Sequence, residues 1–303
     1  MEKILVIGAS GFLGQSVSRY MSEQSNFEVH QTFRKTNREN AFDHYMDLED
    51  KASIAEVLNK VQPSIVINCS GVIGQIDDTD INARLTSNLL EGLADVSFLV
   101  KRIIISGSAA EYGYVLPGEV PVDETVSLRA TQGYGLSKAR EESLALELKE
   151  TYNLPVVVAR IFNPIGSGMG EKFLVSSILR QVAEIKAKKK NDIEVSRLDS
   201  CRDYIAVEDV AGAFKAIIKG EPGYSVYNIG SGVATSNQKL IELMTQNAGL
   251  KYTYKLTQTS DIVEPLVASQ ARIERMKSDF GWVPTVSIDE AVSRITRKED
   301  DKQ

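Results

Sequence analysis

The sequence predicts an α/β fold in which helices cover both faces of a doubly wound parallel sheet, followed by a smaller, discontinuous C-terminal lobe. Short runs of consecutive apolar residues alternate with longer helical segments, as expected for parallel strands buried on both faces. The first apolar run ends in three glycines at intervals of three, where a strand should become a helix. The alternation weakens after residue 160. Together these observations predict a sheet domain at the start of the chain and a second lobe that is built from two separate later segments.

The predicted elements follow from apolar runs and helical periodicity. Leucines at 85, 89 and 93 fall on one helical face, and a proline at 63 precedes an apolar strand. The strands are predicted over 4–7, 27–33, 64–68, 102–105, 155–159 and 225–229, and the helices over 12–21, 51–60, 81–93, 133–151 and 207–219. We assign 1–165 and 205–232 to the sheet domain, and 166–204 and 233–303 to the smaller lobe.

Composition excludes several classes of function. The chain has 303 residues and a net charge of -6, so it carries no electrostatic footprint for nucleic acid. No apolar run approaches the roughly 18 residues that a membrane span requires, and the first residues already resemble a strand rather than a signal peptide. Cys69 and Cys201 lie too far apart for a metal-ligand pair. We therefore expect a cytoplasmic protein without a metal site.

The three glycines predict a dinucleotide-binding turn. In a strand–GxxGxxG–helix segment, Gly8 permits a tight turn, Gly11 allows the backbone to approach a pyrophosphate, and Gly14 lets the helix pack closely on the strand. The free N–H groups at the start of the helix would face the phosphates. A tight turn alone would account for the glycines, but their place at the first strand–helix junction favours a Rossmann dinucleotide-binding domain.

The second predicted strand indicates which dinucleotide binds. An NAD site expects an acidic residue about 20 positions after the glycines. Here the strand is followed by Arg34 and Lys35 instead. An arginine suits a 2'-phosphate, so NADP(H) is favoured, and NAD(H) remains the alternative. A surface arginine that binds no ligand is the competing interpretation.

Three residues could transfer a proton. Tyr134 and Lys138 are four positions apart and share one face of a predicted helix. An ammonium group beside a phenol lowers the tyrosine pKa and makes it a usable proton donor and acceptor. Ser108 follows a predicted strand, at the carboxyl edge where open α/β sheets bind ligands, and its hydroxyl could bind a substrate carbonyl or alcohol. Together the three residues predict proton transfer beside a nicotinamide.

At this point the sequence resembles the extended short-chain dehydrogenase/reductase family, which includes sugar-nucleotide epimerases, dehydratases and reductases. The resemblance spans nearly the whole chain. The segment GASGFLG, which contains Phe12 and Leu13, matches the family's cofactor loop, and YGLSK matches its catalytic tyrosine–lysine pair. The segment ISGSAAEYG carries Ser108 at the family's catalytic serine or threonine. The resemblance thus implies a catalytic set of Ser108, Tyr134 and Lys138, in which Tyr134 and Lys138 also contact the cofactor.

The same resemblance implies further binding residues. Asp47 and Leu48 match the segment whose acid contacts the adenine. Asn163, in RIFNPIG, and Arg202, in SRLDSCRDY, match residues that hold the substrate and its nucleotide phosphates. The family also allows a homodimer through the helices near 81–95 and 133–151.

Within the family, the chain is most similar to reductases of nucleotide-linked 4-keto-6-deoxyhexoses, with those acting on GDP-4-keto-6-deoxymannose nearest. This likeness implies an oxidoreductase of deoxysugar biosynthesis that uses a nucleotide-sugar substrate. The 4,6-dehydratases have an acid pair where this chain has Ala109 and Ala110, and Glu111 is expected to face elsewhere. Because elimination needs an acid and a base, a dehydratase is not expected.

Two alternatives stay open. One is an NAD-dependent nucleotide-sugar epimerase, which the missing acid after the second strand disfavours. The other is a dinucleotide-binding sensor without catalysis, which the intact catalytic set disfavours. The family's Arg-Pro-x-Asp motif is replaced at 264–267 by Glu-Pro-Leu-Val, so the nucleotide base is not assigned.

Overall fold

The computed structural model describes residues 1–34, 40–73, 78–170, 173–251, 253–257 and 269–300. Lys35 and the segment at 264–267, both used above, lie outside these residues. Among the residues described, we find no helix that combines the length and the apolar character needed to cross a bilayer.

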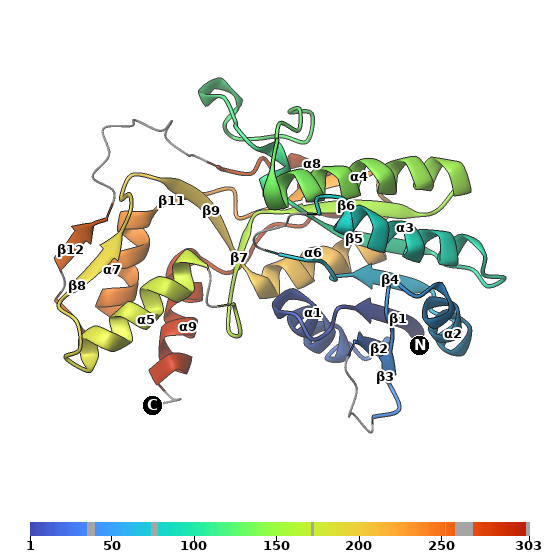
Figure 1. Cartoon of the computed structure of the whole chain (residues 1–303), viewed down its shortest axis with the longest axis horizontal. Coiled ribbons are helices and arrows are strands. Elements are labelled where there is room, and N and C mark those ends of the chain that lie inside the picture. Colours follow the sequence, from blue (N-terminus) through green and yellow to red (C-terminus); the bar gives the residue numbers. More distant parts are fainter. Residues whose placement is uncertain (35–39, 74–77, 171–172, 252, 258–268, 301–303) are drawn as a thin grey trace.

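A seven-stranded sheet forms the centre of the larger part of the molecule (Figure 1). Its strand order is β10-β6-β5-β4-β1-β2-β3, and every neighbouring pair is parallel. The strands are β1 (Glu2–Ile7), β2 (Phe27–Phe33), β3 (Asp43–Tyr45), β4 (Ile65–Asn68), β5 (Arg102–Ser108), β6 (Val156–Ile161) and β10 (Val226–Ile229). The strand order reverses between β1 and β4, which is where sheets of this type bind their ligands.

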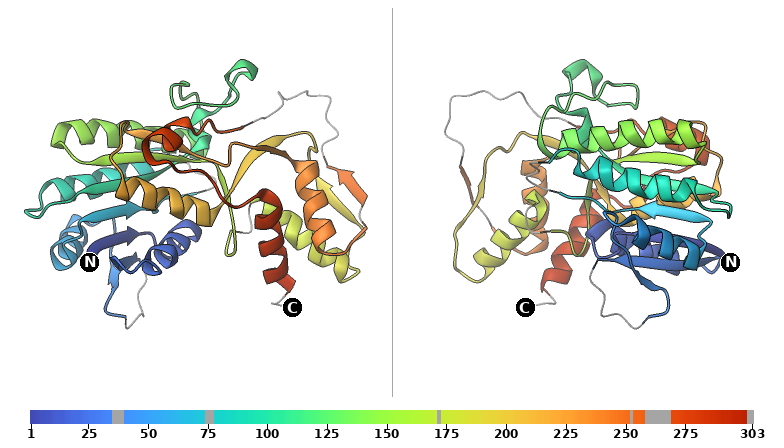
Figure 2. Two further views of the ribbon diagram at one scale, coloured as in Figure 1. Left: turned by 180° about the vertical axis from the view of Figure 1, so that it is seen from behind. Right: turned by 45° about the vertical axis from the view of Figure 1, so that its right-hand side comes forward.

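Helices cover both faces of the sheet (Figures 1 and 2). One face packs against α1 (Phe12–Ser22) and α6 (Val207–Lys219). The other packs against α2 (Lys51–Val61), α3 (Ile81–Ala94) and α4 (Gly133–Tyr152). Because both faces are buried, the strands consist of almost uninterrupted apolar residues. The predicted α/β doubly wound fold is confirmed.

The smaller lobe lies at the left of Figure 1 and has its own core. It contains α5 (Leu174–Lys186), α7 (Asn237–Asn247), α9 (Ile288–Asp300) and the parallel pair β8 (Asp192–Val195) and β12 (Thr253–Leu256). A three-stranded sheet of β7 (Asn163–Ile165), β9 (Cys201–Ala206) and β11 (Ala234–Ser236) follows the order β11-β9-β7. Ile178, Ile241 and Val292 are fully buried in the core of this lobe.

One segment departs from the predicted division of the chain. The prediction assigned all of 233–303 to the smaller lobe, but α8 (Glu274–Phe280) packs against α6 and β10. Met276 and Trp282 join the same buried cluster as Phe214 and Tyr227 of the sheet domain. These apolar side chains cover the region around the edge strand β10, so the C-terminal part of the chain contributes to both cores.

Candidate active site

The loop after β1 contains three glycines, and the fold requires two of them but not the third. Gly8 has a φ of +77°, and a Cβ there would lie 2.8 Å from the Ser70 Cα atom. A Cβ on Gly14 would lie 2.2 Å from the Gly8 carbonyl oxygen. A Cβ on Gly11 would meet only that oxygen, at 3.4 Å, which is a tight but tolerable contact. Packing within the chain therefore explains Gly8 and Gly14, whereas Gly11 leaves open space above the backbone.

This loop fits a dinucleotide. Gly11 is the N-cap of α1 and provides no side-chain hydrogen bond to it, so the first N–H groups of the helix remain available to an anion. Phe12 and Leu13, in the first turn, are half-buried, and Leu13 packs against the core under the sheet. An open backbone position beside a helix N-terminus at the switch point of the sheet is what a pyrophosphate requires.

The other predicted cofactor residues follow β2 and β3. Arg34 comes directly after β2 and is exposed, so its guanidinium group is accessible to a phosphate. The Asp47 carboxylate accepts a hydrogen bond from the Glu49 N–H at 3.0 Å. Leu48 buries its side chain in the core, and its carbonyl accepts from Asn88 at 2.8 Å. Thus Asp47 offers a polar side chain, whereas Leu48 anchors the loop.

Ser108 and Tyr134 meet at the carboxyl edge of the sheet. Strand β5 extends three residues beyond the predicted end and finishes at Ser108, whose hydroxyl caps the 3-10 helix η1 (Ala109–Tyr112) by accepting from the Ala110 N–H at 3.2 Å. Tyr134 lies in the first turn of α4 and is half-buried. Burial raises the pKa of its phenol, whereas the Lys138 charge and a hydrogen bond with Ser108 act in the opposite direction. The net result is a protonated phenol.

Lys138 is buried one turn further along α4, with 3% of its side chain exposed. Its Nζ atom donates to the Ser106 carbonyl at 2.6 Å and forms an ion pair with Glu141. Burial by itself would lower the pKa of Lys138, but the Glu141 charge and then Tyr134 raise it, so the ammonium form prevails. Lys138 therefore places a positive charge beside Tyr134.

A second cluster of buried charged residues lies next to Ser108 and bonds to its backbone. Glu111, which we expected to face elsewhere than the dehydratase acid pair, points into the protein, where its fully buried carboxyl accepts a hydrogen bond from the Ser108 N–H. Burial and then the Glu142 charge raise the pKa of Glu111 well above its usual range. Arg160 forms a two-pronged ion pair with Glu142 and donates to the Tyr112 hydroxyl at 2.9 Å. These bonds fix the turn that presents Ser108.

Besides Ser108, the two other predicted substrate residues lie on neighbouring strands of the small sheet. Asn163, on β7, donates to the Asp203 carbonyl at 2.8 Å. Arg202, on β9, is partly exposed and donates to the Ser200 hydroxyl at 3.3 Å. Strand β7 begins two residues after β6, whose last residue, Ile161, pairs with Ser108. Because β9 pairs with β7, Asn163 and Arg202 lie where the small sheet joins the edge of the large sheet that carries Ser108.

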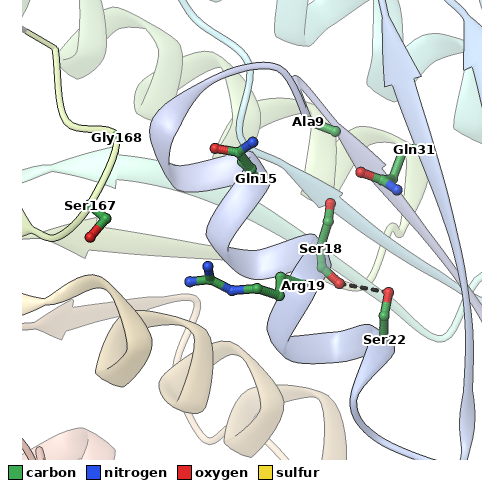
Figure 3. A pocket seen from close by; sticks show the side chains of 8 residues that line it. All are labelled: Ala9, Gln15, Ser18, Arg19, Ser22, Gln31, Ser167 and Gly168. Carbon is green, nitrogen blue, oxygen red and sulfur yellow. Dashed lines mark hydrogen bonds between the residues drawn. The ribbon is translucent and has the colours of Figure 1, made fainter. Parts of the chain in front are cut away.

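A separate polar pocket of about 480 Å³ lies along α1 (Figure 3). Figure 3 shows the Ser22 hydroxyl donating to the Ser18 carbonyl within it, at 2.8 Å. None of the predicted site residues lines this pocket, whose walls are Ala9, Gln15, Ser18, Arg19, Ser22, Gln31, Ser167 and Gly168.

Three features of the site were not predicted from the sequence, namely Glu141, Thr86 and the inward orientation of Glu111. Glu141 follows Lys138 by three positions, which on a helix brings the two side chains together. That spacing was a usable signal. The contact of Glu141 with Thr86, on another helix, depends on how α3 and α4 pack and has no signature in the sequence.

The model of the NAD dependent epimerase/dehydratase family matches residues 4–230. The chain belongs to this family. The predicted family and the predicted class of enzyme, an NAD(P)-dependent oxidoreductase or epimerase, are therefore confirmed.

Several members of the epimerase/dehydratase family resemble the chain over its full length. GDP-6-deoxy-D-mannose reductase of Pseudomonas aeruginosa is 30% identical, and the match covers 97% of this chain and 96% of that protein. Human UDP-glucose 4-epimerase is 25% identical over 98% of this chain and 96% of its own. The structure of RMD from Pseudomonas aeruginosa complexed with NADPH superposes with a TM-score of 0.87, at 25% identity and complete coverage of both chains.

Proposed function

We propose that this protein is an NADPH-dependent reductase of a nucleoside-diphosphate-linked 4-keto-6-deoxyhexose. The observation that carries the proposal is the meeting of Ser108, Tyr134 and Lys138 at the carboxyl edge of the sheet, with the Tyr134 phenol protonated. A protonated donor suits reduction of a ketone. The similarity to GDP-6-deoxy-D-mannose reductase along the whole chain supports the substrate class, and the exposed Arg34 after β2 supports NADPH.

The coenzyme would be held by the glycine loop and the residues after the next strands. Gly11 and the free N–H groups of α1 would bind the pyrophosphate, Arg34 the 2'-phosphate and Asp47 the adenosine. The bound coenzyme would supply a hydride to the keto carbon. As charge develops on the carbonyl oxygen, the Tyr134 hydroxyl would give it a proton, and the Ser108 hydroxyl would donate a hydrogen bond to it.

Lys138 would assist in two ways. Its ammonium group stabilises the tyrosinate that remains after proton transfer, and its place one turn from Tyr134 allows it to hold the coenzyme's ribose. At the far end of the site, Asn163 and Arg202 would bind the nucleotide part of the substrate. Such remote binding fixes the position of the sugar relative to Tyr134. The predicted homodimer would use α3 and α4, which pack side by side in the chain.

Coenzyme oxidation tests the proposal. Purified protein is given GDP- and dTDP-linked 4-keto-6-deoxyhexoses, each with NADPH and with NADH, and absorbance at the nicotinamide band is followed. We expect rapid oxidation of NADPH with one sugar nucleotide. Tyr134→Phe should retain NADPH binding and lose about 10²–10⁴-fold in turnover, the usual contribution of a positioned acid.

The assay also tests the alternative. Several relatives are UDP-glucose 4-epimerases, which favours an epimerase as the second candidate. If no keto sugar oxidises either coenzyme while a UDP-hexose is converted to its C4 epimer, the reductase proposal is wrong. Turnover by Tyr134→Phe at the rate of the unchanged protein would contradict the assigned proton donor under either reaction.

A further inference from the structure

The two histidines of the chain, His30 and His44, lie on neighbouring strands at one edge of the large sheet (Figure 1). The Nδ1 atom of His30, on β2, is 2.9 Å from the Nε2 atom of His44, on β3. The Nε2 atom of His30 is 2.9 Å from a carboxylate oxygen of Glu28. Both histidines are buried, with exposed fractions of 7% and 5%. Glu28, His30 and His44 therefore form a continuous hydrogen-bonded chain across the β2–β3 pair.

A hydrogen-bonded pair of imidazoles can hold one added proton but not two. A neutral imidazole has one N–H donor and one bare nitrogen that accepts, whereas an imidazolium has two donors and no acceptor. With both rings neutral, Glu28 accepts from the Nε2–H of His30, so the bare Nδ1 atom of His30 accepts from His44. One added proton leaves a bare nitrogen between the rings, and the contact persists. Two added protons place an N–H group on each side of it, and the rings must separate.

Charged groups face the histidine pair from four elements. They are Glu28 on β2, Asp43 on β3, Lys60 in the last turn of α2, and Lys3 of β1, which acts with the N-terminal amine on Glu28. Burial, then the His30 charge and then the Lys60 charge lower the pKa of His44, and Asp43 opposes them. The stability that the neutral His44 contributes is therefore fully present above the free histidine pKa of about 6.5. It is lost as the pH falls through the lower pKa of the folded protein.

Strand β3 depends on β2 for its place in the sheet. It is an edge strand of three residues, and its residues 43–45 pair with residues 31–33 of β2. The Gln31 N–H donates to the Phe42 carbonyl at 2.8 Å, and the Met46 N–H donates to the Phe33 carbonyl at 3.1 Å. Local opening is easiest where few buried contacts hold an element. Because the histidine contact is a buried link between the side chains of β2 and β3, its loss loosens this edge.

The same two strands lead directly to the coenzyme residues assigned above. Arg34 follows the last residue of β2, and Asp47 lies two positions after the end of β3. The β2–β3 pairing therefore sets the distance between the group assigned to the 2'-phosphate and the group assigned to the adenosine. Separation of β3 from β2 would leave the two groups without a fixed relative position.

We propose that the His30–His44 pair makes coenzyme binding sensitive to mild acid: a second proton breaks the pair, loosens β3 and weakens the hold of Arg34 and Asp47 on the adenosine half of NADPH. The inference goes beyond the reductase proposal and rests on its coenzyme residues alone. Its test uses no sugar substrate, so it can fail or succeed independently of the proposed reaction.

The first measurement is an NMR titration of the two imidazoles. Because the chain has two histidines, the signals that disappear in His44→Gln assign both rings. Coupled groups take up their protons in two separate steps. We expect the second step of the unchanged protein to lie clearly below the free histidine value of about 6.5.

The second measurement is the affinity for NADPH by calorimetry at about pH 7.5 and about pH 5, where histidine changes its charge. Glutamine at position 44 can offer His30 a donor or an acceptor but cannot take up a proton. The 2'-phosphate of NADPH also titrates in this range, but equally for both proteins, so it cancels from the comparison. The affinity falls with the fraction of molecules that keep the pair, so the loss in acid should be at least about threefold larger in the unchanged protein than in His44→Gln.

Glu56→Gln is the matched control. It removes an exposed carboxylate from α2, the helix that packs against β3, without touching the pair. The acid dependence of NADPH affinity should be the same in Glu56→Gln as in the unchanged protein. Loss of that dependence in Glu56→Gln would assign it to general surface charge and would contradict the proposal.

Two further outcomes would overturn the proposal. One is an equal acid dependence of NADPH affinity in His44→Gln and the unchanged protein. The other is independent titration of both imidazoles near the free value of about 6.5, which decides the question even if His44→Gln does not fold. Failure to bind NADPH at either pH would contradict the coenzyme site and this inference with it. NADPH binding with the expected acid dependence but without reduction of any keto sugar would contradict only the reductase.

Discussion

Replacing Gly11 with alanine should separate cofactor binding from folding more sharply than any other change in the glycine loop. Gly11 has a φ of -77°, an ordinary backbone conformation for alanine. The new Cβ would lie 3.4 Å from the Gly8 carbonyl oxygen and would meet nothing else closer than 4 Å. The methyl group would instead occupy the space where a pyrophosphate must approach the backbone. We therefore expect a folded protein that binds NADPH poorly.

The magnitudes follow from these contacts. Alanine is a poorer N-cap than glycine by roughly 0.5 kcal/mol, and the loss of unfolded-state freedom offsets about the same amount. The free energy of unfolding should therefore change by less than about 1 kcal/mol. Loss of one charge-assisted hydrogen bond to the pyrophosphate costs about 1.5–3 kcal/mol, which corresponds to roughly a 10- to 150-fold weaker affinity for NADPH.

Gly14→Ala provides the control. Its Cβ would lie 2.2 Å from the Gly8 carbonyl oxygen, so backbone must move, and overpacking of this kind costs about 1–3 kcal/mol or more. Urea unfolding and NADPH titration by calorimetry are measured for both variants. Gly14→Ala should lose stability and affinity together, whereas Gly11→Ala should lose affinity alone. NADPH binding by Gly11→Ala with the affinity of the unchanged protein would refute our account of the loop.

Three further predictions concern charged groups. Arg34→Ser should weaken NADPH binding about tenfold or more and leave NADH binding unchanged in calorimetry, because only NADPH carries the 2'-phosphate; equal losses would contradict this role. Glu111, whose usual pKa is 4.5, has its pKa raised by burial, so the folded state binds more protons and stability falls as pH rises through the range above 4.5. Glu111→Gln mimics the protonated carboxyl, so the free energy of unfolding in urea should fall less between pH 5 and pH 8 than in the unchanged protein. If the free energy of unfolding depends on pH equally in both proteins, Glu111 is ionised and the prediction is wrong. Arg160→Met leaves the buried Glu142 unpaired and should cost about 3–5 kcal/mol in urea unfolding. The double variant with Glu142→Gln should lose less than the two single variants together.

The sheet could be predicted from the sequence because its strands are buried on both faces. A run of β-branched apolar residues such as Ile103, Ile104 and Ile105, set between helical segments, is typical of a strand in the middle of a parallel sheet. The strand boundaries were harder to predict, since β5 continues through the small residues Ser106 and Gly107 to Ser108. Small residues give a weak strand signal, and pairing with β6 determines their conformation.

The candidate site was predictable where its members are local in sequence. The spacing of Tyr134 and Lys138 is sufficient to place both side chains on one helix face. The buried polar residues that surround Tyr134 and Lys138 and shift their pKa values were not predictable in the same way. Thr86 reaches Glu141 across 55 positions, and the orientation of Glu111 depends on the fold of η1 and on Arg160. Tertiary packing decides such contacts, and a single sequence carries no record of it.

The return of the chain after the smaller lobe has a practical consequence for dissecting the protein. Residues 271–282 pack onto the sheet domain, with Met276 fully buried and the Arg275 guanidinium group donating to the Val226 carbonyl of β10 at 3.1 Å. A fragment that stops at 232 would expose the apolar surface that this segment covers. The dinucleotide-binding domain therefore cannot be cut out as a fragment that ends at 232. A chimaera that exchanges substrate lobes between relatives must keep the recipient's own residues 271–282, or supply a segment that matches the surface they cover.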